Sequence, residues 1–235
     1  MKYIVVGLLI FASQVSLGQQ ENSRKLTPEQ VYDYLNEATE NINQIQLEEN
    51  SSYVIGETAV GDKCVAFMDK KQFLGSIGAA IFKNVVQNSK NYPILIQGGD
   101  LNRYCPKYAR MDLKNKGLVW VVLLTMVAHF ESSCNLKASA KGPNGTAQGL
   151  FQLHKGKEQK YTDFKKACPK NASLNAKQSG ACTLAMLDDQ MERSSGKIFY
   201  NESYWDVLRP NGRAQRADDI QKALTRFSLC NPHIL

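Results

Sequence analysis

The stretch GLVWVVLLTMVAHFESS, residues 117–133, is the most apolar part of the chain beyond its N-terminus. Its β-branched residues would suit a strand locally, but the run is longer than an ordinary strand and contains no turn signal. A helix that is apolar on every face has to be buried on every face. We therefore predict a central, buried helix from about Asn115 to about Glu131.

A single carboxylate, Glu131, closes this apolar stretch, and no other acidic residue follows it before Lys157. Burial and the partial negative charge of a helix C-terminus both disfavour an ionised carboxylate at this place. The pKa of Glu131 should therefore be raised, and a carboxyl that stays protonated near neutral pH can protonate a leaving group. Glycosidic oxygens need such a proton, because an alkoxide leaves poorly. The alternative is a helix-end glutamate that faces solvent, as most glutamates do.

The N-terminus has the pattern of a secretory signal peptide. An apolar run from Ile4 to Ala12 follows the positively charged Lys2. Ser16 and Gly18 then provide small residues at the two positions that a signal peptidase reads. We predict that residues 1–18 are a cleaved signal peptide, because the run is too short to serve comfortably as a membrane anchor. We also expect no later stretch to be long enough to span a membrane, which predicts a secreted or periplasmic protein without stable membrane insertion.

The six cysteines agree with export, because an even set in an exported chain favours disulfides over a metal site. No pair of them has the short CxxC spacing of a zinc knuckle, and the three histidines form no HxxxH pair. We therefore expect no metal and no cofactor. The sequence leaves the pairing open among Cys64, Cys105, Cys134, Cys168, Cys182 and Cys230.

The formal net charge of +7 is unevenly distributed along the chain. Residues 19–60 contain eight acids and two bases, whereas residues 137–170 contain eight lysines and two acids. The lysines form either a solvated surface or a field that attracts an anionic partner. We expect no nucleic-acid partner, because the chain is predicted to be exported and shows no recognition motif. An anionic cell-wall polymer suits an exported protein better.

The rest of the chain is predicted to be mostly helical. Residues 19–111 are either an N-terminal helical extension or the first part of one domain with residues 112–235. The segment around Tyr92 to Pro106 has the composition of a loop, with Gly98 and Gly99 at its centre. Capping signals and apolar spacing predict further helices that begin after Thr27 and lie within residues 69–88, 179–193 and 217–227.

The order of short motifs after the apolar helix resembles a known family. Glu131-Ser132 is followed by Asn135, a loop rich in glycine, and Gly149-Leu150-Phe151-Gln152. This pattern is similar to the lysozyme-like superfamily of soluble lytic transglycosylases and goose-type lysozymes, with Phe151 in place of the usual methionine. The resemblance is best from about Lys114 to Arg193. It implies a mainly α, lysozyme-like α+β fold whose helical catalytic domain surrounds the helix that ends at Glu131.

The resemblance also implies a reaction and a set of site residues. The family cleaves the β-1,4 bond between N-acetylmuramic acid and N-acetylglucosamine, so Glu131 would be the general acid/base and peptidoglycan glycan strands the partner. Gln152 matches a glutamine that supports the cleft, and Tyr204 is favoured over Tyr200 as the tyrosine that faces the glutamate. His154 stands where goose-type lysozymes have an aspartate, so it would contact sugar or water. The alternatives are packing roles for the tyrosines and a surface position for His154.

Two departures from the family pattern bear on the reaction. Ala140 lies near the place of a serine that contacts the acetamido group in transglycosylases, which predicts an altered dependence on N-acetylation. No motif marks a second catalytic carboxylate, and the more distant candidates are Asp163, Asp188 and Asp206. We therefore favour a monomeric lytic transglycosylase, which needs one acid. The alternatives are a hydrolytic lysozyme and a non-catalytic protein that binds the cell wall.

Overall fold

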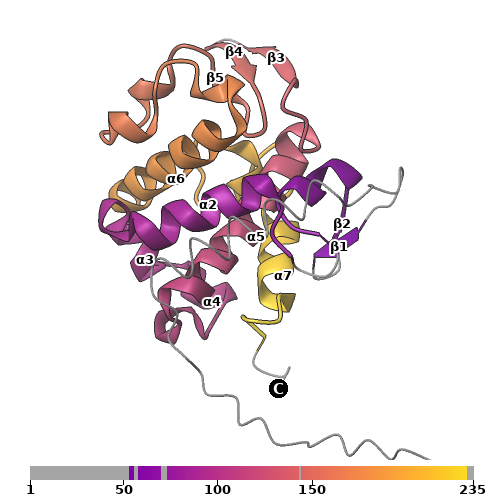
Figure 1. The fold of residues 1–235 in the computed structure, drawn as a ribbon, viewed down its shortest axis with the longest axis vertical. Helices are drawn as coiled ribbons and strands as arrows, with labels where there is room; N and C mark the ends of the chain where they lie inside the picture. Colours follow the sequence, from indigo (N-terminus) through magenta and orange to yellow (C-terminus); the bar gives the residue numbers. More distant parts are fainter. Residues whose placement is uncertain (1–52, 56–57, 70–72, 143, 232–235) are drawn as a thin grey trace, which may run out of the picture.

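The computed structural model describes residues 53–55, 58–69, 73–142 and 144–231 of the 235-residue chain (Figure 1). The predicted signal peptide and the helix expected after Thr27 lie outside the described residues. Two short strands, β1 (Tyr53–Ile55) and β2 (Thr58–Val60), pair antiparallel at the start of the described part.

The predicted central helix is confirmed as α5 (Leu113–Ser132). The side chain of Asp112 caps its start by accepting a hydrogen bond from the Asn115 amide at 2.8 Å. Every residue from Val119 to Ala128 is buried. The expectation that no stretch beyond the N-terminus is long enough to span a membrane is wrong, because α5 meets that test by length and composition. Its burial among the other elements is that of a core helix.

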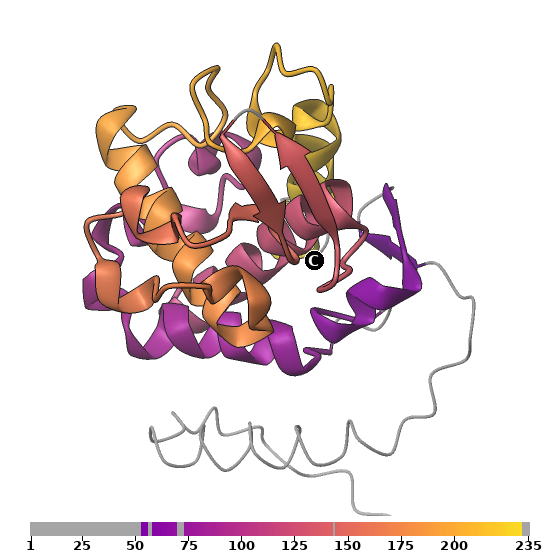
Figure 2. The ribbon, with the colours of Figure 1, turned by 90° about the horizontal axis from the view of Figure 1, so that it is seen from above.

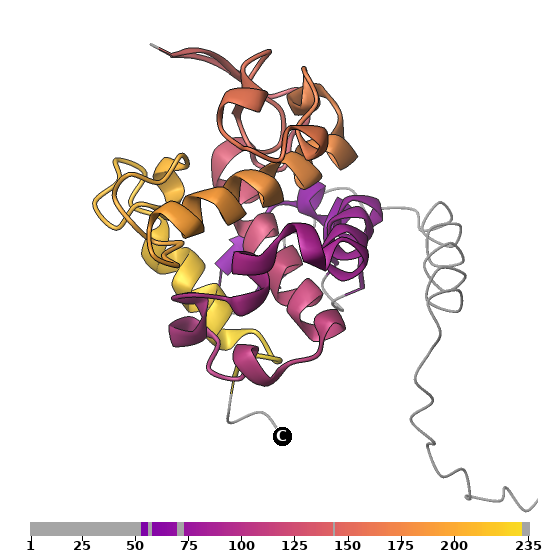
Figure 3. The same cartoon turned by 90° about the vertical axis from the view of Figure 1, so that its left-hand side faces the viewer.

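Three further helices build the helical body: α2 (Ser76–Gln87) and α7 (Ala217–Arg226) pack against α5, and α6 (Ala176–Arg193) packs against α2 (Figures 1 and 3). The helix expected within residues 69–88 is thus present but begins only at Ser76, with Gly75 at its N-cap. Gly78 lies inside the helix against the Phe67 carbonyl, and a Cβ there would come within 1.8 Å of that oxygen. The glycine allows a close approach of α2 to the preceding turn.

The prediction of a loop around Tyr92 to Pro106 is wrong, because this segment contains two short helices, α3 (Pro93–Gln97) and α4 (Leu101–Tyr104). Proline is well suited to the first position of a helix, where it begins α3. Gly98 adopts the left-handed conformation with φ of 87° and ends that helix. Both helices are too short for a periodic apolar pattern to reveal them.

The segment expected to be a glycine-rich loop forms a small antiparallel sheet. Its strands are β3 (Ser139–Gly142), β4 (Gly145–Gln148) and β5 (Leu153–His154), in that order. The β3–β4 hairpin projects from the helical body (Figure 3). The prediction of a mainly α fold with a minor β part is confirmed. Short 3₁₀ helices connect the elements: η1 (Asp62–Ala66), η2 (Ser89–Asn91), η3 (Tyr108–Arg110), η4 (Glu158–Lys160), η5 (Lys165–Ala167), η6 (Ala172–Leu174) and η7 (Asp206–Leu208).

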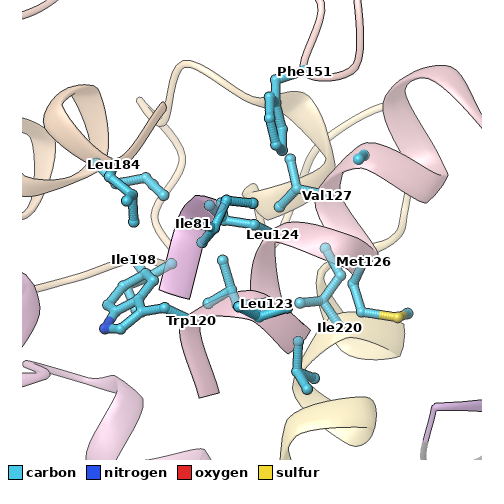
Figure 4. Close-up of a cluster of buried hydrophobic side chains, with 14 of the residues drawn as sticks. Ile81, Trp120, Leu123, Leu124, Met126, Val127, Phe151, Leu184, Ile198 and Ile220 are labelled. Carbon is cyan, nitrogen blue, oxygen red and sulfur yellow. The ribbon is translucent and has the colours of Figure 1, made fainter. Parts of the chain in front are cut away.

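All six cysteines form disulfides, as predicted: Cys64–Cys134, Cys105–Cys230 and Cys168–Cys182. The pairing is consistent with an extracellular or periplasmic protein. One continuous apolar core contains side chains from both sides of Asp112, including Ile81, Trp120 and Phe151 (Figure 4). The described residues before Asp112 therefore share this core with the helices that follow.

Candidate active site

The end of α5 holds Glu131 in a fixed and half-buried position. Ser133 and Cys134 adopt the left-handed conformation and stop the helix two residues later, and the disulfide from Cys134 to Cys64 anchors the exit. The Ser132 hydroxyl lies 3.0 Å from the Ala128 carbonyl and 2.7 Å from the Leu150 carbonyl. A hydrogen bond therefore joins the Glu-Ser pair to the GLFQ segment. This bond explains structurally why a serine follows the glutamate in the motif.

The surroundings of Glu131 favour its protonated form. Burial raises the pKa of the Glu131 carboxyl to about 7, and the nearby negative charge of Asp206 acts in the same direction. A hydrogen bond from the Val207 amide and the positive charge of Arg209 oppose this rise. The carboxyl can thus be populated both as an acid and as a base near neutral pH, which suits a general acid/base.

The three predicted substrate-binding residues lie together, and the charge of Glu131 acts on one of them, Tyr204. The Tyr204 hydroxyl accepts a hydrogen bond from the His154 amide at 2.9 Å and lies 3.2 Å from the Gln152 carbonyl. It also lies 3.1 Å from Nδ1 of the His154 ring. Burial is the main cause that raises the pKa of Tyr204, and the charge of Glu131 adds to it, so the phenol stays protonated beside the carboxylate.

Gln152 contributes to this cluster mainly through its backbone. Its φ of 49° is left-handed, and its side-chain amide donates to the carbonyls of Gly149 at 2.9 Å and Ala138 at 3.3 Å. These bonds hold the turn between β4 and β5, which presents the Gln152 carbonyl to Tyr204. Gln152 thus supports the wall of the site, while the ring of His154 lines the cleft.

Tyr161 is a member of the cluster that the sequence analysis did not identify. Its hydroxyl lies 2.7 Å from Nδ1 of His154, and its ring packs edge-on against Tyr204 with centroids 4.8 Å apart. Burial and the charge of Lys157 lower the pKa of His154, which favours a neutral imidazole. Nδ1 is engaged by tyrosine hydroxyls, so Nε2 is the ring nitrogen available to a ligand in the cleft.

A cleft of about 550 Å³ extends from this cluster along the end of α6. Glu131 is not among the lining residues. Two lining residues connect the cleft to its carboxyl: Arg209, whose charge acts on Glu131, and Tyr204, whose phenol is affected by the charge of Glu131. Figure 2 shows the hairpin directed toward the loops that follow α6, and Asn144 at its tip closes one side. The lining residues are Asn144, His154, Tyr161, Gln190, Arg193, Ser194, Tyr200, Glu202, Ser203, Tyr204 and Arg209.

The three more distant aspartates differ in their position and contacts. Asp206 lies near enough to Glu131 to raise the pKa of its carboxyl. Asp188 is buried and accepts a hydrogen bond from the Leu95 amide at 2.8 Å, so it caps the start of α3. Asp163 is exposed, and its amide donates to Asp189. Tertiary packing brings Asp206 and its neighbour Arg209 to the site. No local sequence motif predicted their role there.

Ala140, which was predicted to lie near the substrate's acetamido group, is an exposed residue of β3. It pairs with Ala147 of β4. Its methyl group supplies no hydrogen-bond donor at this position of the hairpin. Tyr200, the alternative to Tyr204, also lines the cleft, and its hydroxyl donates to Gln190 at 3.3 Å.

Comparison with known proteins finds a similar fold in solved structures of the Bdellovibrio protein DslA (Bd0314). The wild-type form aligns with a TM-score of 0.53 and 21% sequence identity over 66% of this chain and 91% of DslA. A form with one glutamate replaced by glutamine aligns at 22% identity with the same TM-score and coverage. No family model matches the chain, and no curated protein sequence matches it significantly. At this identity the likeness concerns the fold alone.

Proposed function

We propose that the protein is an exported muramidase that cleaves the β-1,4 bond between N-acetylmuramic acid and N-acetylglucosamine in peptidoglycan. The observation that carries this proposal is the setting of Glu131. It is a half-buried carboxyl at the end of a buried helix, next to a cleft, and its pKa is raised to about 7. Such a group suits the protonation of a glycosidic oxygen.

In the first step, protonated Glu131 donates its proton to the leaving oxygen of N-acetylglucosamine while the bond from the muramic C1 carbon to that oxygen breaks. Positive charge develops on the muramic ring, and the carboxylate left on Glu131 stabilises it. The Tyr204 hydroxyl, fixed by the His154 amide and the Gln152 carbonyl, forms the neighbouring wall that orients the sugar.

The position of Asp206 supports a reaction with one catalytic carboxyl. A classical glycosidase needs a second carboxylate, at about 5 Å for retention or about 6.5–9.5 Å for inversion. Asp206 is the acidic residue whose charge raises the pKa of Glu131, but both of its oxygens have protein partners. One lies 3.5 Å from Nη1 of Arg209, and the other accepts a hydrogen bond from the Ala214 amide at 2.7 Å. We assign Asp206 a role in tuning Glu131.

In the second step, the Glu131 carboxylate removes the proton from the 6-hydroxyl of the same muramic acid, and that oxygen bonds to C1. The product is a 1,6-anhydromuramic end, Glu131 regains its proton, and no water is consumed. Proximity favours this route, because the 6-hydroxyl is already attached to the reacting sugar. In the hydrolytic alternative, Glu131 instead directs a water molecule to C1. With Ala140 on the hairpin, either reaction is proposed to depend less on the N-acetyl group.

The proposal is tested by incubating purified sacculi with the protein. We expect turbidity to fall and soluble fragments that contain muramic acid to appear in the supernatant. A non-catalytic wall-binding protein would sediment with the sacculi and release nothing. Undiminished turbidity, with protein shown to be folded by circular dichroism, would contradict the assignment.

The reaction should slow as pH rises above about 7, because the first step needs protonated Glu131 and its pKa is about 7.

Replacing Asp206 by Asn removes a negative charge that raises this pKa, so the alkaline limb of kcat/KM should move to lower pH. The pH profiles of wild-type protein and Asp206→Asn measure this shift. Asp163→Asn, an exposed aspartate that does not act on Glu131, is the matched control. If the alkaline limb of Asp206→Asn lies at the same pH as that of wild type, Asp206 does not raise the pKa of Glu131 and its tuning role is refuted.

A further inference from the structure

Five further residues line the same cleft as Tyr204: Arg193, Ser194, Tyr200, Glu202 and Ser203, which we call its outer arm. We propose that this outer arm binds the peptide stem attached to muramic acid, and that Arg193 binds a carboxylate of that stem. The inference rests on the proposed function, since it names a second part of the same substrate. It adds a charged recognition site to a cleft otherwise built for sugar.

Arg193 is the cation of the arm that is available to a ligand. It is exposed at the last position of α6, and within the described residues it forms no ion pair and no side-chain hydrogen bond. Burial raises the pKa of the Tyr200 phenol and the charge of Arg193 opposes that rise, so the guanidinium lies near this ring. A guanidinium that lines a cleft without a partner suits the two oxygens of a carboxylate.

The second arginine of the cleft, Arg209, is already occupied by the protein. Its Nε donates to the Ser203 carbonyl at 2.7 Å, and its other nitrogens lie 3.5 Å from the Tyr204 carbonyl and 3.5 Å from Asp206. These bonds fold the loop after α6 around the guanidinium. Arg209 therefore shapes the wall of the cleft, and Arg193 remains as the group that can pair with a ligand's charge.

Ser203 provides a second, independent sign of a ligand. Ser203 is a buried residue among those that line the cleft, and its hydroxyl has no hydrogen-bond partner among the described residues. A buried hydroxyl without a partner is costly, which favours a polar group of a ligand at this place. Peptide groups of a stem would supply such donors and acceptors.

The arm is rigidly connected to the sugar-binding side through Gln190. This buried side chain accepts hydrogen bonds from the Tyr204 amide at 2.7 Å and from the Tyr200 hydroxyl at 3.3 Å. Its own amide is fixed by the Met186 carbonyl at 3.1 Å. A single residue thus sets the spacing between the wall near Glu131 and the outer arm, as one substrate with two linked parts requires. Glu202 is also exposed and forms no ion pair with the residues that the structure describes, so it suits an amino group of the same stem.

The test compares peptide-bearing glycan strands with strands from which an amidase has removed the stems. Wild-type protein and Arg193→Gln are each measured on both substrates, and the readout is the ratio of kcat/KM for peptide-bearing to peptide-free strands. We expect Arg193→Gln to lower this ratio about tenfold, the effect of losing one charge-assisted hydrogen-bonded pair. Arg193→Lys keeps the charge without the planar fork and should fall in between.

Arg213→Gln is the matched control, because it removes an exposed arginine that does not line the cleft. It should keep the wild-type ratio. If Arg193→Gln lowers kcat/KM equally on both substrates, or on neither, the ratio stays at the wild-type value. That result would overturn the stem-binding site while leaving the muramidase assignment intact. Absence of cleavage of both substrates by wild-type protein would contradict the proposed function, and this inference with it.

Discussion

Replacement of Glu131 by Gln is expected to lower the rate of peptidoglycan cleavage by on the order of 10³-fold or more, because general acid catalysis and the later base step are both lost. The amide keeps the size of the side chain, so the fold should persist. Release of soluble fragments from sacculi by wild-type and variant protein measures the loss. Glu192→Gln, an exposed glutamate on α6, is the matched control and should retain wild-type activity.

The same substitution should stabilise the protein at alkaline pH. Burial raises the pKa of Glu131 from 4.5 to about 7, so ionised Glu131 is less favourable in the folded chain than in the unfolded chain. The contribution of the protonated carboxyl is complete below pH 4.5 and is lost as pH rises through about 7. Since the group is half-buried, we expect Glu131→Gln to be more stable than wild type by roughly 1–2 kcal/mol at pH 8.

Thermal unfolding of both proteins at pH 4 and pH 8 checks this expectation. The two melting temperatures should be nearly equal at pH 4 and should differ at pH 8 in favour of the variant. Equal melting temperatures at pH 8 would show that Glu131 is solvated in the folded state, and the physical basis for its acid role would then fail. A variant that keeps full cleavage activity would remove that role outright.

Loss of the Cys64–Cys134 disulfide should destabilise the protein more than loss of Cys168–Cys182. The two residues are 70 positions apart, and the bond closes a long loop in the unfolded chain. The chain-entropy relation gives a loss of about 4 kcal/mol when both cysteines become alanine, against about 3 kcal/mol for Cys168–Cys182, which spans 14 positions. Denaturant unfolding of the two double variants measures both losses.

Activity should separate these two variants more clearly than stability does. Cys134 follows the end of α5 by two residues, so removing its disulfide frees the exit of the helix that holds Glu131. Cys168–Cys182 instead joins the end of η5 to α6. We expect a lower cleavage rate in the Cys64–Cys134 variant than in the Cys168–Cys182 variant under conditions where both are folded. A loss of stability below about 1 kcal/mol in the former would contradict the anchoring role.

Much of the helical framework could be predicted from the sequence, because its apolar residues are either continuous or periodic. The apolar run gave α5, and the spacing within residues 179–193 and 217–227 gave α6 and α7. The β3–β4 hairpin could not be predicted in this way. Its strands carry lysine and glycine and are exposed or half-exposed on both faces, so they lack the alternation that marks a strand with one buried face.

The residues of the candidate site also fall into two groups, those that a sequence motif reveals and those that it does not. Glu131, Gln152 and His154 come from one continuous stretch of sequence whose motif order is visible. Asp206 and Tyr161 join them only through packing: the loop after α6 brings Asp206 near Glu131, and the loop after β5 brings Tyr161 against His154. A carboxylate that acts by its charge and a tyrosine that orients a histidine need no fixed spacing from Glu131, so no sequence pattern could reveal them.

Mass spectrometry of the material released from purified peptidoglycan tests the central claim most directly. If Glu131 acts alone and the muramic 6-hydroxyl attacks C1, the fragments will end in 1,6-anhydromuramic acid, lack the mass of one water and resist reduction by borohydride. Fragments that all end in reducible muramic acid would contradict the transglycosylase mechanism and leave a hydrolytic role for Glu131. Absence of any fragment ending in muramic acid would contradict the assignment as a muramidase.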